Sequence, residues 1–197
     1  MLMPSPLELA ANGVTTISIV LAARNHVLTW PLGIVGAVLF AVLFSSTQLY
    51  ADALLQVFFM ATSVIGWRTW QRGDSARLPP VTRTAPGSLG IMLCAALTVT
   101  VTYGQLLHHF TDAYMPFIDS AVLGFSVMAQ LLLMQRRLET WGFWLIVNSL
   151  SVPLFASRGL HLTAALYAFY WVNALWGGWH WWQQYRAPSV NTTAERA

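Results

Sequence analysis

The chain alternates between long apolar runs and short polar breaks such as "RNH", "SST", "HHFTD" and "QRRLE". A helix that crosses a bilayer needs about 20 mostly apolar residues, and seven stretches of the chain fit. They cover residues 6–23, 28–44, 49–70, 87–107, 115–134, 141–155 and 160–182. The second and sixth are short, but flanking tryptophans prefer the membrane interface and can extend them. The pattern therefore predicts an all-α integral membrane protein with seven transmembrane helices.

The amino-acid composition also indicates that lipid, and not water, surrounds most of the chain. The chain is 56% hydrophobic and 9% charged, whereas soluble domains carry roughly 25% charged residues. Nucleic-acid binding is a poor interpretation, because the arginines are scattered between apolar runs instead of gathering on one face. The single cysteine, Cys94, lies inside an apolar run and is expected to be a small buried hydrophobe.

The basic residues predict the orientation. All ten are arginines, and cytoplasmic loops carry an excess of basic residues. If the N-terminus is outside, nine of the ten face the cytoplasm and only Arg158 faces outward. The nine are Arg24, Arg68, Arg72, Arg77, Arg83, Arg136, Arg137, Arg186 and Arg196. The sequence thus predicts an outer N-terminus and a cytoplasmic C-terminus.

The chain also repeats itself at an offset of 111 positions. Trp30 then falls on Trp141, and Gly66 on Gly177. Because tryptophan and glycine matches without a gap are rare by chance, we expect two three-helix repeats, over residues 6–72 and 115–183, in one transport domain over 1–197. The unpaired helix over 86–110 restores the direction of the second repeat, and 184–197 form a cytoplasmic tail. Parallel repeats of this 3+1+3 kind are a known plan of transporters.

Polar and aromatic residues inside the spans mark the candidate site, because an unpaired polar group in hydrocarbon is costly. Trp141, Trp144 and Asn148 fall within about 60° of one helical face. Two further stripes hold Tyr167, Tyr170 and Asn173 in the last span, and Gln56, Thr62 and Ser63 in the third. These amides and aromatic faces suit a flat, polar solute, and tryptophan faces also attract cations.

Other interpretations stay open for these residues. Asn148 and Asn173 could form interhelical hydrogen bonds that only hold the bundle together. Trp67, Trp70, Trp179, Trp181 and Trp182 are expected to anchor span ends at the interface, and Gly66 and Gly177 to be close-packing positions. The five histidines lie mostly at span ends, so we expect no metal, haem or other cofactor. No catalytic motif was found, which argues against an enzyme.

Several stretches resemble the Pnu family of bacterial vitamin transporters, which includes nicotinamide riboside transporters. The similar stretches are "LYADALLQVFF", "IGWRTW", "ALYAFYWVNALWG" and the long run from Pro116 to Phe155. The resemblance implies a fold related to the SWEET sugar carriers, in the inner membrane of a bacterium. It also implies facilitated diffusion of nicotinamide riboside, a precursor of NAD, with a cytosolic kinase trapping the vitamin by phosphorylation. A homo-oligomer is compatible with the resemblance.

In this family the site lies at mid-membrane around a WxxWxxxN pattern, which here reads Trp141, Trp144 and Asn148. The resemblance also carries Gln56, Tyr167, Tyr170 and Asn173 into the site. The chain has Ser63 where many nicotinamide riboside transporters have asparagine, so thiamine, and after it riboflavin, remain alternative substrates. A membrane-embedded enzyme or haem-binding protein is the alternative from a different class.

The orientation can be tested by fusing reporters to the two ends of the chain. A reporter fused to the N-terminus should lie outside the cytoplasm, and one fused to the C-terminus should lie inside it, because the loops that hold nine arginines are expected to stay in the cytoplasm. Termini on the same side of the membrane would contradict a seven-span chain.

Overall fold

The computed structural model describes residues 5–46, 50–71, 79–111, 114–157, 159 and 161–187, except the side chains of residues 44, 46, 50–54 and 162. Within these ranges the chain forms seven helices and no strand, and each predicted span coincides with one helix. The helices are α1 (Pro6–Ala23), α2 (Thr29–Ser46), α3 (Tyr50–Gln71), α4 (Pro86–Phe110), α5 (Pro116–Met134), α6 (Thr140–Ser157) and α7 (His161–Arg186). Arg72, Arg77, Arg158, Arg196 and tail residues 188–197 lie outside the described residues.

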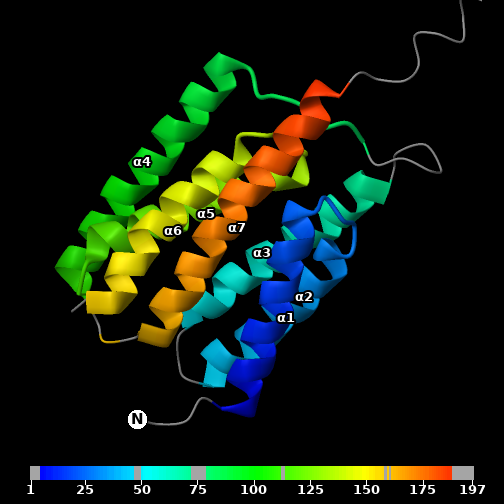
Figure 1. The fold of residues 1–197 in the computed structure, drawn as a ribbon. Coiled ribbons are helices and arrows are strands. Elements are labelled where there is room, and N and C mark those ends of the chain that lie inside the picture. Colours follow the sequence, from blue (N-terminus) through cyan, green and yellow to red (C-terminus); the bar gives the residue numbers. More distant parts are fainter. Residues whose placement is uncertain are drawn as a thin grey trace, which may run out of the picture.

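Six of the helices form a closed ring, and α4 lies outside it (Figure 1). Among the described residues, α2 packs against α1 and α3, and α6 packs against α5 and α7. Contacts between α1 and α7 and between α3 and α5 then join the two halves, while α4 packs only against α5. The all-α 3+1+3 architecture is thus confirmed.

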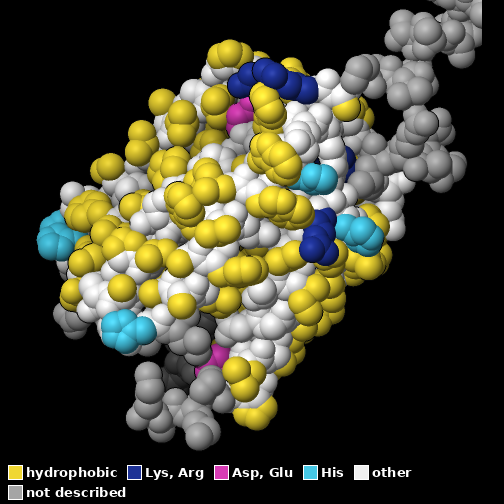
Figure 2. Space-filling view, in the orientation of Figure 1, with side chains coloured by type: hydrophobic (Ala, Val, Ile, Leu, Met, Phe, Trp, Pro, Cys, Tyr) yellow, Lys and Arg dark blue, Asp and Glu magenta, His cyan; other side chains and the backbone are white. Residues whose placement is uncertain are grey.

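The surface and the interior have the polarity expected in lipid. Figure 2 shows apolar side chains over most of one face, and α4 exposes Ile91 and Phe110 by 72% and 80%. Cys94 on this helix is exposed, so its predicted burial was wrong. Buried polar residues include Gln130, Asn148 and Asn173. Apolar side chains thus cover the surface of the spans, and polar side chains lie in the interior together with further apolar ones, as expected where lipid surrounds the helices.

Length and composition alone qualify only some of the helices as spans. Within the described residues, α1, α4 and α5 are long and apolar enough to cross a membrane, and Thr29–Leu43 of α2 is apolar but shorter. The remaining helices α3, α6 and α7 carry tryptophan, asparagine or glutamine inside the bundle, which lowers their mean hydropathy. These three helices are less apolar because they carry the polar side chains of the bundle interior.

The internal repeat is confirmed by contacts that recur 111 positions apart. Asn25 and Arg136 both have positive φ, 58° and 55°, in the turns after α1 and α5. The Oγ1 of Thr29 donates to Ser18 O, and the Oγ1 of Thr140 donates to Ala129 O, each at 2.8 Å. The same two turns and the same cross-helix bonds therefore shape both halves.

One tryptophan and one glycine make a close contact between neighbouring helices in each half. A Cβ at Gly66 would lie 2.5 Å from the ring of Trp30, and a Cβ at Gly177 would lie 2.7 Å from the ring of Trp141. Glycine is thus required for the indole ring of one helix to lie against the backbone of the next. Both glycines are close-packing positions, as predicted.

A tryptophan layer, formed by Trp30, Trp70, Trp141 and Trp181, closes the ring at one end. Trp70 and Trp181 are 1% and 0% exposed, so the prediction that they anchor the helices at the interface was wrong. The glycines admit Trp30 and Trp141, which hold these two rings inside the bundle. Trp179 and Trp182 are 55% and 40% exposed, as interfacial anchors would be.

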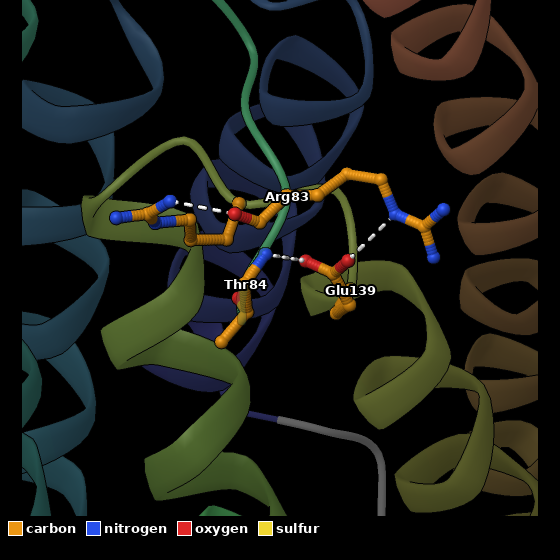
Figure 3. A network of polar contacts seen from close by, with 4 residues as sticks. Arg83, Thr84 and Glu139 are labelled. Carbon is orange, nitrogen blue, oxygen red and sulfur yellow. Dashed lines mark hydrogen bonds and ion pairs between the residues drawn. The ribbon is translucent and has the colours of Figure 1, made fainter. Parts of the chain in front are cut away.

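The described arginines lie at the end of the bundle that holds the tryptophan layer, which we call the arginine-rich end (Figure 2). Here α1, α3, α5 and α7 end, and the segment 79–85 crosses the turn between α5 and α6. Glu139 accepts hydrogen bonds from Thr84 N at 3.0 Å and from Arg83 Nε at 3.2 Å (Figure 3). Desolvation alone would raise the pKa of Glu139, but these bonds outweigh it and lower the pKa.

The packing of Trp30 on Gly66 can be tested by substitution. Gly66→Ala should lower the free energy of unfolding by about 1–3 kcal/mol, since the new methyl must displace a buried ring. Thermal melting in detergent would measure the loss. Gly13→Ala is the matched control, because nothing lies within 4 Å of the added Cβ there. Equal melting temperatures for the two variants would contradict the assigned contact.

Candidate functional site

The interior of the ring holds the predicted site residues at successive depths from the tryptophan layer. Asn148 is seven positions beyond Trp141 along α6, which corresponds to about 10 Å of helix rise. Thr62 and Asn173 each precede the tryptophan of their own helix by eight positions, or about 12 Å. These three residues therefore lie at similar depth on three helices, and Gln56 and Tyr167 lie farther from the layer.

Asn148 is a predicted site residue whose amide has no hydrogen-bond partner among the residues that the structure describes, and the buried Nε1 of Trp141 likewise has none there. Asn148 is 4% exposed. Ser151, one turn farther along α6, is 0% exposed, and its Oγ also has no partner within the described ranges. Since buried polar groups are normally hydrogen-bonded, this face of α6 is suited to bind a polar solute.

Trp144 lies one turn from Asn148 and is only partly buried between the two apolar clusters of the bundle. Its equivalent in the first half is Gly33, whose Cβ would lie 3.4 Å from the hydroxyls of both Ser18 and Ser63. One half thus offers an aromatic face where the other offers small hydroxyl residues. A flat solute between the halves would meet a different surface on each side.

Tyr170 and Asn173 are predicted site residues that already have partners. The hydroxyl of Tyr170 is hydrogen-bonded to Thr16 Oγ1 at 2.8 Å, and Asn173 Nδ2 donates to Ile19 O at 3.3 Å. Both bonds cross from α7 to α1, that is, from one half to the other. These residues are therefore engaged in holding the halves together, one of the alternatives that the sequence left open for Asn173.

A similar bond joins the halves on the other side of the ring. Thr62 Oγ1 donates to the carbonyls of its own helix at Phe58 and Phe59, and it accepts from Gln130 Nε2 at 3.4 Å. In the repeat Thr62 corresponds to Asn173, and Gln130 corresponds to Ile19. The two bonds therefore lie at equivalent places, but the amide side chain belongs to α7 in one bond and to α5 in the other. Sequence reasoning missed Gln130, although an amide inside the apolar run "VMAQLLLM" could have indicated it.

The remaining predicted residues surround this centre. Tyr167 is half-buried, and its ring centroid lies 5.1 Å from that of Phe155 and 5.7 Å from that of Tyr170. Gln56, the repeat equivalent of Tyr167, is half-buried on α3, and Ser63 is buried one position beyond Thr62. Trp141 belongs to the tryptophan layer, with its ring centroid 5.4 Å from that of Trp181. The arrangement supports binding between two unlike surfaces.

Comparison with known proteins identifies the family. The sequence profile described as nicotinamide mononucleotide transporter matches residues 5–183. The chain belongs to this family. It is therefore a multi-pass membrane transporter and not an enzyme.

Individual relatives agree with this assignment. The chain is 29% identical to the nicotinamide riboside transporter PnuC of Escherichia coli (strain K12), over 89% of this chain and 81% of that protein. It is also 29% identical to the riboflavin/roseoflavin transporter RibM of Streptomyces davaonensis, over 92% and 87% of the two chains. The crystal structure of the vitamin B3 transporter PnuC superimposes with a TM-score of 0.71 at 21% identity, covering 89% of this chain and 80% of that one. This last similarity shows a common fold.

The partner assignments predict that two asparagines differ in role. Asn173→Ala should lower the melting temperature, because losing its bond to α1 costs about 1 kcal/mol. Asn148→Ala should leave stability nearly unchanged, because it breaks no bond within the described residues. Thermal melting of both purified variants would compare them, and equal losses would contradict the assignment.

Proposed function

We propose that this transporter carries nicotinamide riboside by facilitated diffusion along the axis of the ring. Support comes from the unpartnered amide of Asn148 beside the partly buried indole of Trp144, which together carry the proposal. Nicotinamide riboside has a cationic pyridinium ring, a carboxamide and ribose hydroxyls. The indole can stack on the ring by a cation–π contact, and the asparagine can both donate to and accept from the carboxamide.

Charge also favours a nucleoside over a nucleotide. The described arginines lie at the arginine-rich end and not beside Asn148, whereas a phosphate bound in the interior would need a cationic partner. The sequence places no aspartate or glutamate at the middle of a span, so the π face of Trp144 would balance the positive charge of the substrate. The remaining proposed contacts are Trp141 on the side of the tryptophan layer and Gln56, Thr62, Ser63, Tyr167, Tyr170 and Asn173 around the ring.

Transport would follow from movement of the two halves about a substrate that contacts both. The halves meet along α1 and α7 and along α3 and α5, and the substrate would lie between these two contacts. Rocking would open the interior to one side at a time. With the arginine-rich end in the cytoplasm of a bacterial cell, a cytosolic kinase would trap the vitamin by phosphorylating it.

Thiamine and riboflavin are the second candidates. Thiamine is also an aromatic cation and could stack on Trp144 in the same way. Riboflavin is favoured by the similarity to RibM, which equals the similarity to the Escherichia coli transporter in identity. The three vitamins differ in charge and in the groups at the rim of the ring, so direct binding would separate them.

Calorimetric titration of the purified protein with the three vitamins tests the proposal. Nicotinamide riboside should bind tightest. Trp144→Ala and Asn148→Ala should each weaken its binding about 10-fold or more, since each removes a cation–π contact or a hydrogen bond. Trp179→Ala is the matched control, because this tryptophan is 55% exposed at the outside of the bundle.

Uptake into liposomes tests the driving force. The initial rate should not depend on a proton or sodium gradient, because facilitated diffusion uses only the gradient of the vitamin. Binding of another vitamin alone would overturn the assigned substrate, and unchanged affinity in both site variants would overturn the assigned site. An uptake rate that collapses with the ion gradient would overturn uniport.

A further inference from the structure

The tryptophan layer lies across the axis that relates the two halves. The ring centroids of Trp30 and Trp70 are 5.2 Å apart and those of Trp141 and Trp181 are 5.4 Å apart, both pairs with an interplanar angle of 86°. The pairs meet through Trp70 and Trp181, which are repeat equivalents with centroids 5.8 Å apart. A solute that moved along the axis of the ring would therefore meet Trp70 and Trp181 at the arginine-rich end.

A buried arginine covers this pair of rings. The Cζ of Arg136 lies 4.8 Å from the ring centroid of Trp70 and 5.8 Å from that of Trp181. The residue is 3% exposed, and its Nε and Nη1 have no hydrogen-bond partner among the described residues. Burial lowers the pKa of Arg136 to about 10, so the side chain is still a cation at neutral pH. The contact that compensates its burial is the one with the two indole faces.

The repeat shows that the scaffold does not require arginine at this place. Asn25 occupies the equivalent turn of the first half with nearly the same positive φ, and its amide donates to Gln184 Oε1 at the edge of the bundle. The backbone of Arg136 is fixed separately, because its carbonyl accepts from Thr82 N at 3.0 Å. The turn would thus persist without the guanidinium, whose described contacts are with the two rings.

We propose that the paired faces of Trp70 and Trp181 form a second binding subsite, for an aromatic cation, which Arg136 occupies while this end is closed. The identity of the cation rests on the proposed function. A pyridinium leaving the central site would displace the guanidinium and take over its cation–π contact. One cation then replaces another on the same faces, so the path opens without leaving these faces uncovered. Arg136 is a positioning residue in this scheme, and the two tryptophans contact the substrate.

Substitution of Arg136 tests the subsite in membrane vesicles of known sidedness. Arg136→Asn is the suitable variant, because Asn25 shows that asparagine accepts this turn. Without the competing guanidinium, the KM for nicotinamide riboside presented from the arginine-rich side should fall about 10-fold, the scale of one cation–π contact. The KM from the opposite side should change by less than about twofold, because that path does not meet Arg136 first.

Two matched variants show whether the charge is the cause. Arg136→Lys keeps a cation over the rings and should behave like the wild type. Arg24→Gln removes an arginine that stacks on the exposed Trp176, 5.9 Å from its ring centroid, and should change neither KM. Equal changes in KM from both sides, no change from either side, or a lysine variant that behaves like the asparagine variant would each overturn the subsite.

A second measurement distinguishes failure of the subsite from failure of the proposed function. If the wild-type protein does not transport nicotinamide riboside, the proposed function fails. The subsite is then tested by quenching of tryptophan fluorescence in the purified protein with 1-methylnicotinamide, which is methylated at the ring nitrogen and is therefore a permanently charged pyridinium. Arg136→Asn should bind this probe about 10-fold more tightly than the wild type or Arg136→Lys. Equal quenching of the three proteins would overturn the subsite.

Discussion

The bundle depends on the contact of an indole ring with a glycine backbone, made once in each half. Lipid provides no hydrophobic driving force between helices, so close van der Waals packing must hold them together. Trp30 on Gly66 and Trp141 on Gly177 supply this packing where α2 meets α3 and α6 meets α7. Both contacts lie in the tryptophan layer, at the arginine-rich end. The remaining interior can then accept polar residues that contribute little to packing.

The separation between a packed tryptophan layer and a polar interior explains how two similar halves can surround an asymmetric interior. The repeat preserves the residues that set the backbone, while other positions have diverged in chemistry. Gly33 corresponds to Trp144, Ala37 to Asn148, and Asn25 to Arg136. In the first two pairs the second half carries the aromatic or amide group, and in the third it carries the cation that lies over Trp70 and Trp181. The first half has small residues at the positions of Trp144 and Asn148, so the two sides of the interior differ in chemistry.

The sequence predicted the fold well because the relevant signals are local or periodic. Apolar runs determined the helices, and the offset of 111 positions determined the repeat. The errors concern which way a side chain points within a correctly placed helix. Trp70 and Trp181 have the position of interfacial anchors, but they lie inside the bundle against Trp30 and Trp141, which the glycines admit. Tyr170 and Asn173 lie on the predicted face, yet α1 provides their partners, and no pattern within α7 reveals a contact with a helix 154 positions away. The predicted substrate contacts themselves remain predictions.

The position of α4 determines how the molecule divides mechanically. Among the described residues this helix packs against α5 alone, and the segment before it is hydrogen-bonded to Leu138 and Glu139 in the turn between α5 and α6 of the second half. Any motion between the halves must carry α4 along with α5, α6 and α7. The protein therefore divides into a smaller body of three helices and a larger one of four. The fourth helix, α4, adds an apolar surface that contacts the lipid. Displacement relative to the membrane should fall mainly on the smaller body.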